Sequence, residues 1–109
     1  MAENTIKINP AITDYLHNIG ATYKLGRVFL FGSTAHGTAE WDSDIDLAIF
    51  SADVTEDNEI EIMTDLLIKA MPYKLDIQPL VFPLEDYHSD NDFIQKEIIE
   101  RGIEIYPAS

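Results

Sequence analysis

Two aspartates, Asp44 and Asp46, open an apolar run that ends at Phe50. Side chains on a strand alternate between its two faces, so both carboxylates would point to one side and Ile45 and Leu47 to the other. Two carboxylates held together repel each other unless a cation or a proton intervenes. Because Mg²⁺ is bound through one or two carboxylates together with substrate phosphates, the pair predicts a magnesium site.

A tight glycine turn stands before the acidic pair. Gly32-Ser33 ends an apolar run that begins at Val28, and ten residues separate Ser33 from Asp44. Glycine permits a positive φ angle and a close approach of the backbone to a ligand. Ser33 can cap the helical turn that follows, whose N–H groups would face an anion. We therefore expect Gly32 and Ser33 to contact the terminal phosphates of a nucleoside triphosphate.

A third acid, Asp76, lies in the short alternating run from Lys74 to Ile77. If a strand over 73–78 neighbours the one over 44–50, Asp76 joins the acidic pair on one face of the sheet. There it would act as a metal ligand or as the general base for an attacking hydroxyl group. The alternative is that the three acids are ordinary strand-end carboxylates, since short motifs also match by chance. Three acids gathered on one face would be costly without a cation, which favours the metal site.

The elements that must hold these residues alternate between helix and strand. Helices are expected over residues 9–20, 33–37, 53–70 and 90–102. Strands are expected over residues 27–31, 44–50, 73–78 and 103–105. This order predicts an α/β domain (α+β, with a mixed sheet) of about four strands flanked by helices.

Apolar spacing and polar caps set the expected faces and ends of these helices. The first helix would bury Ile12, Tyr15, Leu16 and Ile19. The helix over 53–70 would begin at a capping box over 53–56. Its buried stripe would consist of Ile60, Met63, Leu67 and Met71. Pro79 and Pro83 would end the third strand, a loop would follow over 83–92, and Asp90 or Asn91 would cap the last helix.

Composition and charge limit the classes of function. The 109 residues are consistent with a single domain over 1–109, with 1–8 as a tail. The chain has no cysteine, no signal-peptide hydrophobic region and no apolar run near the roughly 18 residues of a membrane span. We therefore expect a cytoplasmic protein without a membrane partner. The net charge of −13 predicts no direct nucleic-acid partner and an attraction to a basic protein, although acidity can also serve solubility alone.

The stretch FGSTAHG, followed by WDSDIDLAIF and a later lone aspartate, resembles the nucleotidyltransferase superfamily that includes DNA polymerase beta. The small size resembles its minimal nucleotidyltransferase (MNT) branch, whose members are often encoded beside HEPN-domain partners as toxin–antitoxin pairs. The resemblance covers residues 10–106 or so, and it implies the nucleotidyltransferase fold. It assigns Gly32 and Ser33 to nucleotide phosphate contacts, Asp44 and Asp46 to metal binding, and Asp76 to the third acidic position.

The function that this resemblance implies is Mg²⁺-dependent transfer of AMP from ATP. The expected acceptor is a hydroxyl group, with tyrosine as the leading residue type, on a basic HEPN-type toxin that forms a hetero-oligomer with this chain as its antitoxin. Thr34 and His36 stand where family members often carry arginine, and the nearest basic residues in sequence are Lys24, Arg27 and Lys74. The alternative function is therefore a catalytically weak or inactive antitoxin that neutralises a basic RNase toxin by direct binding. Transfer to a small molecule is less favoured, because such relatives generally add a further domain for the acceptor.

Overall fold

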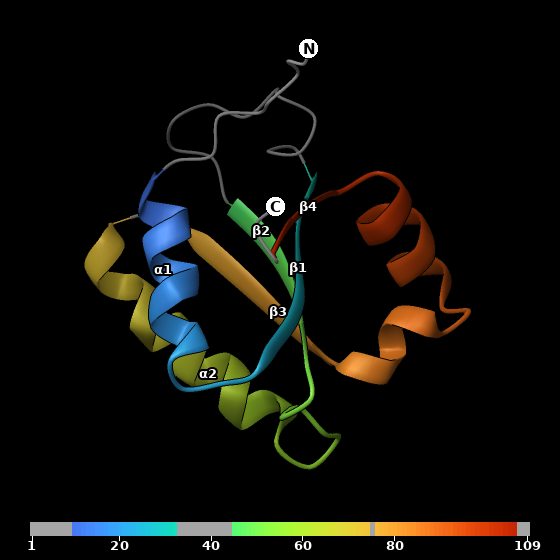
Figure 1. Ribbon diagram of the computed structural model, residues 1–109, viewed down its shortest axis with the longest axis horizontal. Coiled ribbons are helices and arrows are strands. Elements are labelled where there is room, and N and C mark those ends of the chain that lie inside the picture. Colours follow the sequence, from blue (N-terminus) through green and yellow to red (C-terminus); the bar gives the residue numbers. More distant parts are fainter. Residues whose placement is uncertain (1–9, 33–44, 75, 107–109) are drawn as a thin grey trace.

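The computed structural model describes residues 10–32, 45–74 and 76–106, and within them it shows a four-stranded mixed sheet (Figure 1). The strands are β1 (Leu25–Phe31), β2 (Ile45–Ser51), β3 (Ile77–Pro83) and β4 (Ile103–Tyr106), in the order β3-β2-β1-β4. β2 runs antiparallel to β1 and parallel to β3, and β4 runs antiparallel to β1. The predicted mixed sheet is therefore confirmed.

Helices cover both faces of this sheet, as Figure 1 shows. α1 (Pro10–Gly20) and α2 (Glu59–Ala70) pack on one face, whereas η3 (Leu84–His88) and η4 (Phe93–Glu100) pack on the other. A short turn of 3-10 helix, η2 (Met71–Tyr73), follows α2. No helix in the described segments is long and apolar enough to cross a membrane.

The face under α1 and α2 holds a mainly aliphatic core. Its buried strand residues are Val28, Leu30, Leu47, Ile49, Ile77 and Val81. α1 adds the four residues that its spacing predicted, namely Ile12, Tyr15, Leu16 and Ile19. The Tyr15 hydroxyl donates a hydrogen bond of 2.8 Å to the Leu66 carbonyl oxygen. This bond ties α1 to α2 inside the core, where an unpaired hydroxyl would be costly.

α2 buries a different stripe from the predicted one. The prediction of Ile60, Leu67 and Met71 as buried residues is wrong, since they are 73%, 42% and 73% exposed, whereas Met63 is partly buried against the core. The residues that face the sheet are Ile62, Leu66 and Ala70. Apolar side chains occupy more than one side of this helix, so helical spacing fits either stripe. Packing against the sheet selects between them.

α2 also begins later than the predicted capping box over 53–56 implies, at Glu59. The Asp53 carboxylate instead accepts a hydrogen bond of 2.7 Å from the Lys24 N–H. The Asn58 side chain donates a hydrogen bond of 2.9 Å to the Asp53 carbonyl oxygen. These polar residues therefore form a turn that leads into the helix, which is a common use of Asp and Asn.

β3 does not occupy the predicted range of 73–78. Lys74 has a φ angle of 57°, and its N–H closes the turn of η2, so the chain bends there instead of extending. The strand is Ile77–Pro83, and it includes Pro79. Proline is tolerated because β3 lies at an edge of the sheet, with β2 as its neighbour in the described sheet.

The face under η3 and η4 is rich in aromatic rings. The Phe50 ring stacks on Phe82 with ring centroids 5.1 Å apart and meets Phe29 edge-on at 6.0 Å. Ile94 and Ile98 of η4 are buried beside these rings. The two faces of the sheet thus carry separate cores of different composition.

The connections around η3 and η4 follow the prediction in part. Residues 84–88 belong to the predicted loop over 83–92 but form the short helix η3. Asn91 caps the start of the last helix, because its Oδ1 accepts a hydrogen bond of 3.1 Å from the Ile94 N–H. β4 pairs with β1 and confirms the short strand predicted at 103–105.

Candidate active site

Gly32 and Asp46 lie against each other at one end of the sheet. β1 ends at Phe31, whose partner on β2 is Asp46, so the turn after β1 starts beside this carboxylate. Gly32 has a φ angle of +77°, which side chains other than glycine rarely adopt. A Cβ atom at Gly32 would also collide with the Asp46 carboxylate. Glycine is therefore required at this position for two reasons, namely the positive φ angle of the turn and the close approach of the Asp46 carboxylate.

The Asp46 carboxylate is half-buried and lacks a partner among the described residues. Asp46 alternates with Leu47 and shares the parity of Ala48 and Phe50, which places it on the face of η3 and η4. Burial raises the pKa of the Asp46 carboxyl group above its ordinary value. A partly buried carboxylate without a counter-charge is stabilised by a nearby cation, so the oxygen donor fits a hard metal ion such as Mg²⁺.

Asp76 stands beside the start of β2, on the same face as Asp46. The Ile45 N–H donates a hydrogen bond of 2.8 Å to the Asp76 carbonyl oxygen, which holds the two chain segments together. The side chain of Gln78 donates a hydrogen bond of 2.8 Å to Asp76 Oδ1. Gln78 is in turn the register partner of Asp46 on β2, and partners in neighbouring strands point to one face. Asp76 thus precedes β3, although the prediction placed it inside a strand.

Gln78 also lies at this end of the sheet, and its place beside the acids was not predicted from the sequence. Its amide lies between the two described acids, bonded to Asp76 and opposite Asp46. Its alternation with Asp76 is visible in the sequence, but its place opposite Asp46 depends on the strand register. Register follows from the three-dimensional pairing of β2 and β3, which a single sequence does not fix.

Several predicted features lie outside the described residues. These are Ser33, Thr34, His36, Asp44 and the short helix over 33–37. Among the described residues, no group of three acidic, histidine or cysteine side chains gathers to hold a metal ion. The described part of the candidate site therefore consists of Gly32, Asp46, Asp76 and Gln78.

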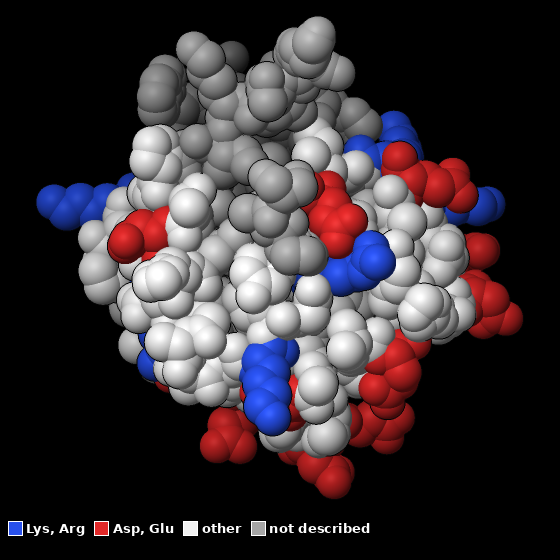
Figure 2. Space-filling view, in the orientation of Figure 1, with Lys and Arg blue, Asp and Glu red and all other residues white. Residues whose placement is uncertain are grey.

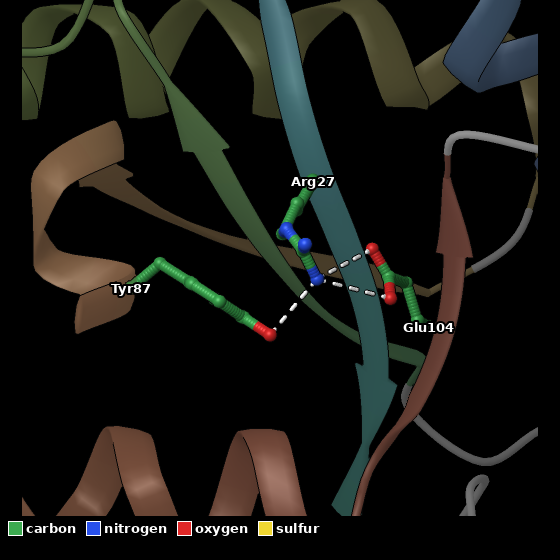
Figure 3. Close-up of polar contacts among 3 residues, drawn as sticks. All are labelled: Arg27, Tyr87 and Glu104. Atoms are coloured by element: carbon green, nitrogen blue, oxygen red, sulfur yellow. Dashed lines mark hydrogen bonds and ion pairs between the residues drawn. The ribbon is translucent and has the colours of Figure 1, made fainter.

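The opposite end of the sheet holds a different polar group, the Arg27 cluster of Arg27, Tyr87 and Glu104 (Figure 3). The Arg27 guanidinium donates hydrogen bonds of 2.8 Å to the Tyr87 hydroxyl and 3.2 Å to each Glu104 carboxylate oxygen. It also lies over the Tyr87 ring, 4.1 Å from the centroid. Arg27 precedes the site end of β1 by four residues and is committed to this cluster, so it does not serve the candidate site.

A second polar contact, between Tyr23 and Asp65, lies at the same end as the Arg27 cluster. The Tyr23 hydroxyl donates a hydrogen bond of 2.6 Å to Asp65 Oδ2. This bond raises the pKa of Tyr23 to about 12 and lowers the pKa of Asp65 below its ordinary value. Lys69 also pairs with Asp65, at 3.4 Å. The charged groups here are therefore compensated by neighbours within the chain.

Comparison with known proteins adds a family and a fold. The family model described as "Polymerase beta, Nucleotidyltransferase" matches residues 14–109. No curated protein matches the chain. The described acids and the glycine turn all lie within the matched range.

Solved structures of toxin–antitoxin complexes contain chains of similar fold. One, a toxin–antitoxin structure with AMP-PNP, has a TM-score of 0.57 at 24% identity, over 87% of this chain and 69% of the other. A mutant of the toxin–antitoxin MntA-HpeT has a TM-score of 0.58 at 24% identity, over 92% and 73%. A second mutant of that complex has a TM-score of 0.57 at 22% identity, over 89% and 72%. At these identities the likeness establishes a shared fold.

Proposed function

Because the chain belongs to the polymerase beta nucleotidyltransferase family, we propose that it transfers AMP from ATP to a hydroxyl group of a HEPN-type toxin and is the antitoxin of that toxin. The observation that carries the proposal is the half-buried Asp46 carboxylate, which lies against the Gly32 turn and has no partner among the described residues. Asp76 stands on the same face. An acid and a glycine turn in contact suit a metal-bound triphosphate.

Each candidate residue has a separate task in this reaction. The backbone of Gly32 and Ser33 would receive the phosphates, and Asp44 and Asp46 would hold the metal, with Asp76 as a further ligand or as the base. The acceptor oxygen would attack the α-phosphorus while the bond from that atom to the bridging oxygen breaks. Pyrophosphate would leave, and the hydroxyl proton would pass to Asp76. Mg²⁺, when bound, would stabilise the charge on the attacking and leaving oxygens.

The proposed partner follows from two observations. Chains of similar fold occur in solved toxin–antitoxin structures, one of which contains AMP-PNP. This chain has a net charge of −13, which attracts and steers a basic protein. The resemblance to minimal nucleotidyltransferases implies tyrosine as the leading acceptor residue.

The test is incubation of the purified chain with its proposed HEPN-type toxin, ATP and Mg²⁺, followed by intact-mass measurement of the toxin. We expect a mass gain of one or more AMP groups with the wild type and none with Asp46→Asn or Asp76→Asn. Asp90→Asn is the matched control, because Asp90 is an exposed acid outside the sheet, in the connection between η3 and η4. An unmodified toxin, or equal modification by Asp46→Asn and Asp90→Asn, would contradict the proposed transfer.

Neutralisation by binding alone is the second candidate function. It is favoured by the commitment of Arg27 to Tyr87 and Glu104, which leaves that cation unable to contact a triphosphate at the other end of the sheet. In this case the double variant Asp44→Asn/Asp46→Asn still blocks the RNase activity of the toxin. If transfer is the mechanism, the same variant binds the toxin but does not neutralise it.

A further inference from the structure

α2 and the first residue of η2 carry an exposed apolar stripe beside the buried one. Its members Ile60, Leu67, Ile68 and Met71 are 73%, 42%, 57% and 73% exposed. Residues 60, 67 and 71 follow helical spacing and lie on one side of the helix. We call these four residues the α2 stripe. Leu67, Ile68 and Met71 line one groove, and apolar surface gathered in this way on a protein of net charge −13 is typical of a site for another protein.

The α2 stripe continues into a groove that reaches the candidate site. The groove has a volume of about 240 Å³, and one wall is formed by Leu67, Ile68 and Met71. Asp76 and Gln78, at the start of β3, lie on the other wall. The groove therefore leads from α2 to the chain segment that carries Asp76, at the β3 edge of the sheet.

The charge around the stripe selects the kind of partner. Acids lie on the first half of α2 and in the turn before it, among them Glu56, Asp57, Glu59 and Glu61. Figure 2 shows acidic side chains gathered along the lower margin of the molecule, near the start of α2 in Figure 1, and at the right margin, on the side of η3 and η4. Two copies of this chain would repel each other at such charge, whereas a partner with basic residues around an apolar contact would be attracted.

We propose that the α2 stripe and its groove are the docking surface for the protein acceptor. The partner would present apolar side chains to Leu67 and Met71, ringed by Lys or Arg, and would bring its acceptor hydroxyl group to the Asp76 end of the groove. This inference rests on the proposed function, since it names the surface that holds the substrate of that reaction. Large apolar side chains at the centre of such a contact carry most of the binding energy.

The experiment measures the Kd of the HEPN-type toxin by calorimetry for the double variant Leu67→Gln/Met71→Gln. The matched control is Thr13→Gln/His17→Gln, which changes two exposed residues at the same spacing on α1. We expect the stripe variant to weaken toxin binding by at least about tenfold, while the control and the affinity for MgATP do not change. Ile60→Gln, at a side chain 73% exposed, repeats the test with a single change if the double variant does not fold.

An unchanged Kd for the stripe variants would overturn the docking proposal. So would a wild-type dimer that the stripe variant converts to a monomer of unchanged toxin affinity, since the stripe would then bind a second copy. Failure of the proposed reaction has a different signature. In that case the toxin binds the wild type and not the stripe variant, but no AMP is added to it by either.

Discussion

The two ends of the sheet differ in whether their charged side chains have partners within the described residues. At the end where β1 begins, Arg27 is bonded to Tyr87 and Glu104, and Asp65 accepts a hydrogen bond from Tyr23. At the other end, the Asp46 carboxylate is half-buried with a raised pKa and no partner among the described residues. Neighbours within the chain therefore compensate the charges at the first end, and the second end leaves a charge for a ligand to compensate.

This difference indicates that one end of the sheet contributes to stability and the other to function. Natural proteins keep unfavourable electrostatics at sites where activity needs them, and other regions supply the stability. We therefore expect changes at the Arg27 cluster to affect unfolding and changes at Asp46 to affect activity. The predictions below test that separation.

The largest expected effect is on AMP transfer by Asp46→Asn. Loss of the proposed metal ligand should slow the proposed transfer at least about a hundredfold, because a bound metal would supply several kcal/mol of charge stabilisation. Arg27→Gln should transfer AMP at a rate within about twofold of wild type, since its partners lie at the other end of the sheet. Radiolabelled AMP incorporation measures both. Equal losses in the two variants would remove the distinction between the ends.

Next in size is the effect of Gly32→Ala on stability. A side chain at a φ angle of +77° is strained, and this one also meets the Asp46 carboxylate, so we expect a loss of about 1–3 kcal/mol in the free energy of unfolding. Urea denaturation measures it. Gly20→Ala is the control, because its Cβ would make an ordinary contact of 3.5 Å with Leu25. An equal change in both variants would show that the turn is not specially constrained.

A smaller effect is expected at the Arg27 cluster. Arg27→Gln should lower the free energy of unfolding by about 0.5–1 kcal/mol, because a partly exposed ion pair and a hydrogen bond are lost. Arg101→Gln should cost less, since its pair with Glu97 is longer, at 3.5 Å, and more exposed. Thermal melting compares the two. A double-mutant cycle with Glu104→Gln that shows no coupling would refute the role of the pair.

The smallest expected effect concerns Tyr23→Phe, and it depends on pH. The folded pKa of Tyr23 is raised to about 12, so its contribution to stability is complete below its unfolded value of 10 and is lost as pH rises through about 12. The lowered pKa of Asp65 adds stability above the unfolded value of 3.8 that is lost as pH falls. Melting temperatures should therefore differ between variant and wild type at neutral pH and converge at both extremes. A constant difference would exclude this hydrogen bond as the cause.

The sequence predicted correctly those elements whose apolar residues fit only one arrangement. α1 and its four buried residues follow from one apolar stripe, and the mixed sheet follows from strand and helix order. It failed for α2, where two apolar stripes compete, and for β3, where Pro79 is compatible with a strand only because the strand lies at an edge. Both errors concern facts of packing that lie outside the local sequence.

The candidate site, too, could be predicted from the sequence only in part. The contact of Gly32 with Asp46 is expected once β1 and β2 are neighbours, because a glycine turn and an acid then meet at one end. The place of Gln78 opposite Asp46 required the register of β2 and β3. The roles of Asp44 and Ser33, the single domain over 1–109 and the cytoplasmic location stay predictions of the sequence.

The prolines of β3 have a consequence for how other proteins recognise this edge. Pro79 and Pro83 lack N–H groups, and in an edge strand the missing donors face outward. A foreign strand is therefore hindered from extending the sheet there by main-chain pairing, which tolerates many sequences. Recognition along this border then depends more on the shapes and charges of side chains.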